Sequence, residues 1–255
     1  MASFVNSWHN FIFLVVFLLS MTDDQFLDIP KDFRQELIPV RQEQILLSSH
    51  IVLESNLSLE DITHVAGFDV AYSQDDSLAC ASLVVIDFRT LEPVEEHFEF
   101  FEPPIPYIPS FLYYRESPGY LILLKRLEIK PELFLFDGNG IIHPYGIGLA
   151  SQMGLEMKKP TVGISKKLLF GEFVPPIRKG GYSDITYKNQ RIGVAYQSAE
   201  PPAKPIYLSQ GHLISFNTMI YIIREFIQNQ IFDTKLPTPL LLADKLAREK
   251  IGEKE

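Results

Sequence analysis

Two aspartates lie within or directly after apolar runs that are typical of buried strands. Asp69 stands between Phe68 and Val70, and Asp137 follows the apolar residues 133–136. An unpaired carboxylate is costly to bury, so each needs a compensating group. If Asp69 and Asp137 end adjacent strands, their carboxylates converge and a divalent cation is the natural counter-charge. The plain alternative for Asp137 is a turn, because Asp-Gly pairs favour turns.

Three further residues could serve the same chemistry. Glu116, beside Arg115 at the start of a predicted helix, could supply a third oxygen ligand, and His212 follows a predicted strand. Mg²⁺ suits a few carboxylates and keeps waters that a substrate phosphate can displace. Such a centre can hydrolyse a phosphodiester by activating water and neutralising the leaving oxygen. Lys166 could neutralise phosphate or orient the water, and His212 could act as ligand, base or orienting group.

The elements that must position these residues follow from the hydrophobic pattern. Residues 64–73, 78–88 and 93–101 alternate as three strands with short turns, which predicts an antiparallel meander. Helices and strands then alternate, which predicts an α/β fold with a mixed central sheet flanked by helices. Strands are predicted at 133–137, 161–166, 191–198 and 206–211, and helices near 34–52, 111–129, 148–157, 213–229 and 239–249.

Composition places few limits on the partner. The chain has 255 residues, 46% of them hydrophobic, which fits one large domain. Its net charge of −9 argues mildly against nucleic acid, yet residues 158–191 hold eight basic side chains against two acidic ones. That stretch is either a phosphate-facing rim or a solvated loop and strand edge. Cys80 is the single cysteine, so no internal disulfide forms, which suits a reducing compartment.

The N-terminus is unlike the rest of the chain. Residues 11–21 are continuously apolar, but no lysine or arginine precedes them and no small-residue cleavage site follows. We interpret residues 1–21 as an apolar extension, arising from a mis-assigned start before Met21 or forming a signal-like anchor, and residues 22–255 as one catalytic domain. The anchor reading would make the protein membrane-associated.

Five stretches resemble the endonuclease V family: GFDVAYS, PYIPSFLYYRE, LFDGNGIIHPYGIGLASQMG, PTVGISKKLLFG and YLSQGHLISF. They occur in the family's order over roughly residues 61–248. The resemblance implies an RNase H-like fold in which Asp69, Glu116 and Asp137 hold Mg²⁺, with Mn²⁺ as a substitute. It also matches Lys166 and His212 to catalytic positions of the family.

The same resemblance implies a site for a flipped base. A base outside the helix needs a close pocket, which glycines permit. The family has a wedge whose tyrosine fills the gap beside that base, and it corresponds here to Pro106, Tyr107, Ile108 and Pro109. The alternative is that these residues form a Pro-rich loop that only connects two elements. Asn139 stands where the family usually has histidine, so we leave it outside the catalytic set. The implied lesion contacts on the glycine loop are Gly138, Gly140, His143 and Gly148.

These observations predict a Mg²⁺-dependent endonuclease of DNA repair that cuts the second phosphodiester bond 3′ to deoxyinosine. An inosine-specific endoribonuclease is the nearest alternative, and no residue decides between them, although an RNA enzyme would contact the 2′-hydroxyl. A catalytically dead nucleic-acid-binding protein is disfavoured because all five catalytic candidates are present. We expect a cytoplasmic monomer that binds nucleic acid and has no stable membrane partner.

Overall fold

The computed structural model describes residues 28–54, 57–232 and 234–254, and the chain forms two compact units, residues 1–47 and 48–255. In the first unit, η2 (Lys31–Phe33) leads into α2 (Arg34–Ser48), where the buried Arg41 donates hydrogen bonds to Asp28 at 2.5 Å and Gln44 at 2.9 Å. The apolar segment 1–21 lies outside the described residues. None of the helices within the described ranges is both long and apolar enough to cross a bilayer.

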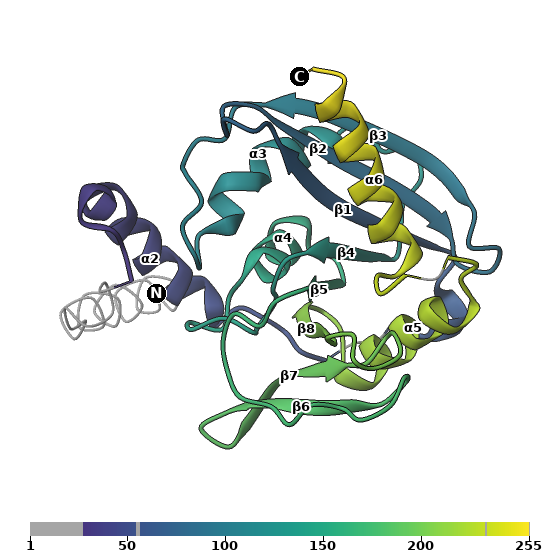
Figure 1. Cartoon of the computed structure of the whole chain (residues 1–255). Coiled ribbons are helices and arrows are strands. Elements are labelled where there is room, and N and C mark those ends of the chain that lie inside the picture. Colours follow the sequence, from purple (N-terminus) through teal and green to yellow (C-terminus); the bar gives the residue numbers. More distant parts are fainter. Residues whose placement is uncertain (1–27, 55–56, 233, 255) are drawn as a thin grey trace, which may run out of the picture. The chain divides into compact units, whose positions relative to one another are not determined.

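The second unit is built on one mixed sheet of eight strands in the order β3-β2-β1-β4-β5-β8-β7-β6 (Figure 1). A 3-10 turn, η3 (Leu59–Asp61), precedes the first strand. The strands are β1 (His64–Tyr72), β2 (Ala79–Asp87), β3 (Pro93–Phe101), β4 (Leu133–Asp137), β5 (Thr161–Ser165), β6 (Tyr182–Tyr187), β7 (Gln190–Tyr196) and β8 (Ile206–His212).

The strand pairing confirms the predicted sheet and extends it. The first three strands form the antiparallel meander, and β1, β4 and β5 run parallel. Beyond β5, the strands β8, β7 and β6 are all antiparallel to their neighbours. The sequence pattern does not predict β6, an edge strand in which three polar residues are mixed with Tyr182, Ile185 and Tyr187 and only Ile185 is buried.

Helices cover both faces of the sheet. On one face lie α3 (Leu112–Leu124) and α4 (Leu149–Met157), which pack on Phe68, Leu83 and Phe136. On the other lie α5 (Phe216–Asn229) and α6 (Thr238–Gly252), which pack on Val65, Leu135 and other residues of opposite parity. Figure 1 shows α6 lying across β1 and β2. Side chains alternate between the faces of a strand, so parity decides which helices a strand residue meets.

Candidate active site

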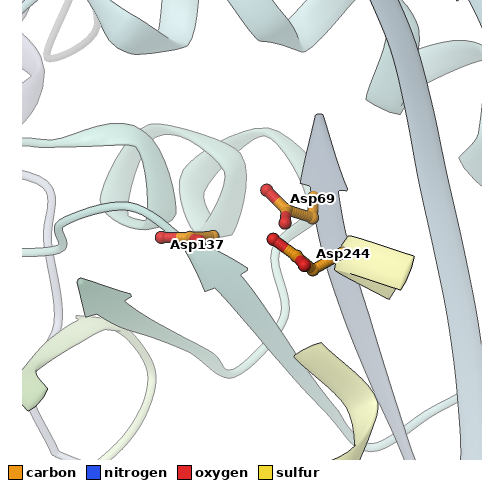
Figure 2. A group of neighbouring side chains, drawn as sticks. All are labelled: Asp69, Asp137 and Asp244. Carbon is orange, nitrogen blue, oxygen red and sulfur yellow. The ribbon is translucent and has the colours of Figure 1, made fainter. Parts of the chain in front are cut away.

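An acidic cluster forms where β1 and β4 pass under α6. Phe68 of β1 is paired with Phe136 of β4, so the next residues, Asp69 and Asp137, stand side by side on parallel strands. Both are odd-numbered, like Val65 and Leu135 of the same strands, so their side chains lie on the face of the sheet that α6 covers. Asp244 of that helix points toward them (Figure 2). One carboxylate oxygen from each lies within 4.8 Å of the others. The predicted convergence of Asp69 and Asp137 is therefore present, with a third aspartate that the sequence analysis missed.

Lys166 bridges two of these carboxylates directly after β5. Its Nζ donates to Asp137 Oδ2 at 2.8 Å and to Asp244 Oδ1 at 3.3 Å. Burial opposes the charge of Lys166, but the carboxylates outweigh it and raise the pKa of the ammonium group. Arg248, one turn after Asp244, donates to its Oδ2 at 3.0 Å. Two cations thus hold the acidic cluster together.

The cluster fits a hard divalent cation. Burial and the neighbouring charge of Asp137 raise the pKa of Asp69 well above its ordinary value, although Lys166 partly opposes them. A cation would stabilise the charged form of Asp69, and convergent carboxylate oxygens suit Mg²⁺ or Ca²⁺ rather than soft metals. Asp69, Asp137 and Asp244 are the residues that could hold it.

Glu116 lies near this cluster but is not grouped with the aspartates. It belongs to α3, on the opposite face of the sheet, where its Oε1 accepts from Tyr72 at 2.8 Å and its Oε2 from Tyr120 at 3.0 Å. Burial raises the pKa of Glu116 to about 8; the two tyrosine hydrogen bonds oppose the rise and the charge of Asp137 adds to it. Its charge also raises the pKa of Asp69, so the two sides of the site are electrostatically linked.

The structure does not bring His212 to the cluster. It pairs with Thr161 at the start of β5, whereas Asp137 and Lys166 lie at the other end of β4 and β5. Its Nδ1 accepts from the Val52 backbone N–H at 3.2 Å, and burial lowers its pKa. A position at the end of a strand marks His212 in the sequence, but β8 is antiparallel to β5, so its end falls at the opposite edge.

Asp244 carries a weak sequence signal. It is an acid within the run PLLLADKLA, on a helix whose neighbouring Leu240 and Ala243 are fully buried. A carboxylate beside a buried helical stripe needs a partner. That partner becomes known only when α6 is seen to cross β1, a contact so close that a Cβ on Gly67 would meet the Pro239 carbonyl carbon at 2.4 Å.

A small pocket on the loop that follows Asp137 is lined by three of the residues expected to contact the lesion. These are Tyr107, His143 and Gly148. Tyr107 is 63% exposed, whereas His143 is buried, with Nε2 at 3.1 Å from the Ser110 carbonyl oxygen. The pocket is about 40 Å³, far below the roughly 300 Å³ of a typical ligand pocket, so a base can enter only if a lining side chain moves. The other lining residues are Ser110, Leu112, Asn139, Leu149 and Leu169.

The glycines of the loop after β4 serve close packing of the backbone. A Cβ on Gly140 would meet the Gln210 carbonyl oxygen at 2.0 Å, and one on Gly148 would meet the Asn139 carbonyl oxygen at 2.3 Å. A Cβ on Gly138 would meet the flexible Leu149 side chain at 2.8 Å. Gly140 and Gly148 therefore let the loop close on β8 and on itself, which sets the shape of the pocket.

The tetrapeptide 106–109 combines an exposed tip with an anchored base. Ile108 is buried, and Pro106 and Pro109 are exposed on either side of the Tyr107–Ile108 pair. The Arg115 guanidinium donates at 2.5 Å to the carbonyl oxygen of Ile105, directly before this tetrapeptide. The prolines fix φ, so the loop presents the Tyr107 ring to solvent on a stiff support.

Comparisons with known proteins agree with this geometry. The Endonuclease V family model matches residues 46–245. The Endonuclease V of Thermosipho melanesiensis is 38% identical over 84% of this chain and 91% of its own. The Endonuclease V structure from Bacillus subtilis has a TM-score of 0.78 at 33% identity, covering 89% of this chain and 96% of that one.

A third relative was solved with nucleic acid. The Endonuclease V of Ciona intestinalis, in complex with a 24mer DNA containing an inosine followed by a ribo-adenosine, has a TM-score of 0.76 at 26% identity, covering 87% of this chain and 99% of that one. The likeness to Endonuclease V structures confirms the predicted RNase H-like α/β fold. The chain belongs to the endonuclease V family of nucleases, which act on phosphodiester bonds in DNA.

Proposed function

We propose that the protein is a Mg²⁺-dependent repair endonuclease that recognises deoxyinosine in DNA and hydrolyses the second phosphodiester bond 3′ to it. The observation that carries this proposal is the convergence of three aspartates with Lys166, which bonds to two of them. Asn139, two residues after Asp137, belongs to the lining of the Tyr107–His143 pocket. Family membership supports dependence on a divalent metal. We expect Mn²⁺ to substitute, because it also takes carboxylate and water ligands.

The proposed chemistry divides between the cluster and its neighbours. Asp69, Asp137 and Asp244 would hold the metal, which supplies an activated water and stabilises the charge of the leaving oxygen. The Lys166 ammonium, already placed between two carboxylates, would neutralise a phosphate oxygen or orient the water. Glu116 would act from the α3 side through its hydrogen bonds with Tyr72 and Tyr120, and through its negative charge once a bound cation favours the ionised form. His212 receives no step, because it lies at the other edge of the sheet.

Lesion recognition would use the pocket and the tetrapeptide 106–109. Tyr107 would fill the gap left by the flipped base, and His143, Gly138, Gly140 and Gly148 would form the wall and backbone of the base pocket. The high exposure of Tyr107 supports this role, since a purely structural aromatic side chain is usually buried.

A second candidate is cleavage of inosine-containing RNA. The observation that favours it is the nucleic acid of the Ciona intestinalis complex, in which a ribo-adenosine follows the inosine. A ribonucleotide at that position offers a 2′-hydroxyl for recognition, which DNA lacks. We further propose that the protein acts as a monomer in the cytoplasm, without a stable membrane partner; the single cysteine supports a reducing compartment.

The deciding experiment is cleavage of matched single strands that differ only in carrying deoxyinosine in DNA or inosine in RNA. The products are mapped to the nucleotide in Mg²⁺, in Mn²⁺ and in EDTA. Metal-dependent cutting at the second bond 3′ to deoxyinosine supports the proposal, and cutting confined to RNA replaces it with the second candidate. Asp69→Ala is the inactive control, and equal turnover by that variant would refute the assignment of the cluster.

A further inference from the structure

The loop that leads into β6 exposes apolar and basic side chains together. We call residues 174–182 the flank loop. Ile177 is 91% exposed, Val174 76% and Tyr182 48%, and Arg178 and Lys179 between them are also exposed. Isolated exposed apolar side chains are ordinary, but three within nine residues, around a shallow hollow, indicate a surface that binds something.

The flank loop lies at the same edge of the sheet as the acidic cluster. Tyr182 pairs with Tyr196, and Tyr196 pairs with Ile206. The neighbour of Ile206, Tyr207, pairs with Ser165, so Ile206 comes level with Lys166. One row therefore crosses the sheet from Lys166 to Tyr182. Three strand spacings separate β5 from β6, which places the loop about 14 Å from the Lys166 backbone across the sheet.

Hydrogen bonds hold the flank loop in place. The Ser183 hydroxyl donates to the Val174 carbonyl oxygen at 2.5 Å. The Gly180 N–H donates to the Gln197 carbonyl oxygen at 2.8 Å, and the Gln197 N–H donates to the Gly181 carbonyl oxygen at 2.9 Å. The exposed side chains thus stand on a backbone tied to β6 and β7 and do not depend on a partner for their position.

The charge of this edge suits a polyanion. From residue 166 to residue 182 the chain carries Lys166, Lys167, Arg178 and Lys179 against the single acid Glu172, whereas the whole protein has a net charge of −9. Arg178 and Lys179 form no ion pair with any residue in the described ranges. Lysine and arginine that stand free of carboxylates beside a nuclease centre are available to phosphates.

The register also divides the basic stretch 158–191 into two groups. Lys188 and Arg191 lie at the β6–β7 turn, at the edge that holds His212, and Arg191 is engaged by the Phe216 ring at 4.0 Å and by Asp184 at 3.6 Å. Lys159 precedes β5 at that same edge. Of the eight basic residues in this stretch, Lys166, Lys167, Arg178 and Lys179 lie at the edge of the acidic cluster.

We propose that the flank loop binds the single strand that continues from the lesion, with Arg178 and Lys179 on its phosphates and Ile177 and Tyr182 against its bases. Phosphate contacts together with stacking side chains are the usual means of binding single strands without sequence preference. This inference rests on the proposed function for the location of the lesion. At the rise of about 3.4 Å per nucleotide of a stacked strand, 14 Å corresponds to roughly four nucleotides from the cluster.

The first test measures binding of an undamaged single strand of roughly 20 nucleotides, with Ca²⁺ in place of Mg²⁺, over a range of salt concentrations. Arg178→Ala/Lys179→Ala should reduce the slope of log affinity against log salt by about 1.4, because each lost phosphate contact contributes about 0.7. Ile177→Ser/Tyr182→Ser should lower affinity about tenfold with the slope unchanged. The matched control Lys130→Ala/Lys159→Ala removes two exposed lysines at the other edge and should change neither.

The second test uses cleavage of deoxyinosine strands whose 5′ and 3′ flanks are lengthened separately. Both flank-loop variants should cleave short substrates like the wild type and lose about tenfold in kcat/KM once one flank passes roughly four nucleotides. An unchanged salt slope, a slope change equal to that of the control, or a loss independent of flank length would overturn the inference. The binding test needs no lesion, so it separates failure of this surface from failure of the proposed inosine activity.

Discussion

Glu116 offers a thermodynamic test of the site that needs neither substrate nor metal. We expect Glu116→Gln to stabilise the metal-free protein at alkaline pH. In the folded protein, burial raises the pKa of Glu116 from 4.5 to about 8. The folded state therefore holds the proton more tightly than the unfolded chain, so the free energy of unfolding falls as pH rises from 4.5 to 8. Glutamine has no charge to desolvate and escapes this loss.

The size of the effect follows from the pKa interval. At 1.36 kcal/mol per pH unit, the interval from 4.5 to 8 corresponds to a loss of about 5 kcal/mol above pH 8, of which roughly 3 kcal/mol is reached at pH 7. The glutamine amide fits the Tyr72 and Tyr120 hydroxyls less well than the carboxylate does, which costs about 1 kcal/mol at every pH. The quantity to compare is therefore the pH dependence of each protein rather than its stability at one pH.

The assay is urea unfolding in EDTA at pH 5 and pH 8, followed by far-UV and near-UV circular dichroism. The wild type should lose about 4 kcal/mol more than Glu116→Gln between these pH values. Saturating Mg²⁺ should reduce the difference, because a cation at the cluster favours the charged form of each carboxylate. Removing the Glu116 charge also lowers the pKa of Asp69, so Asp69 adds to the difference between the two proteins in the same direction. Parallel pH profiles for the two proteins would show that Glu116 carries no buried charge, and the electrostatic description of the site would fail.

Three other predictions address the cluster, the pocket and the loop. Asp244→Asn should raise the Mg²⁺ concentration for half-maximal cleavage by at least about tenfold, measured by metal titration, and an unchanged titration would remove Asp244 from the metal site. Tyr107→Ala should weaken binding of a deoxyinosine strand about ten- to a hundredfold while affinity for an undamaged strand changes less; an equal loss for both would make Tyr107 structural. Gly140→Ala should cost about 3 kcal/mol in thermal unfolding, because its Cβ would meet the Gln210 carbonyl oxygen at 2.0 Å, whereas Gly252→Ala, with open space around it, should not destabilise.

Local sequence patterns are sufficient to predict most of the sheet. The meander and the strand that ends at Asp137 have clear apolar alternation or continuous apolar runs, and their parity places Asp69 and Asp137 together. Neither β6 nor the direction of β8 has such a signal, because β6 buries only Ile185 at the edge of the sheet and strand direction depends on the connections between elements. For this reason His212 is predicted at the wrong edge of the sheet and β6 is missed.

The third aspartate of the cluster shows a different limit. Asp244 is helical and far along the sequence from Asp69 and Asp137, and only the docking of α6 on β1 brings it to them. Hydrophobic periodicity predicts that α6 is buried on one face, but it does not state which strands that face covers. The pocket has the same limit, since Leu169 and Ser110, far apart in the sequence, line it together only after the loops around it have folded.

The docking of α6 on the sheet has a consequence for how this enzyme folds during synthesis. The sheet from β1 to β8 precedes α6 in the order of synthesis, so a nascent chain can pair β1 with β4 and still lack the carboxylate of Asp244. Contacts between residues so distant in sequence form late in folding, because the intervening chain must be ordered first. The cluster of three aspartates is therefore complete only when the helix of residues 238–252 docks, and on the proposed function a partly translated chain would lack a complete metal site.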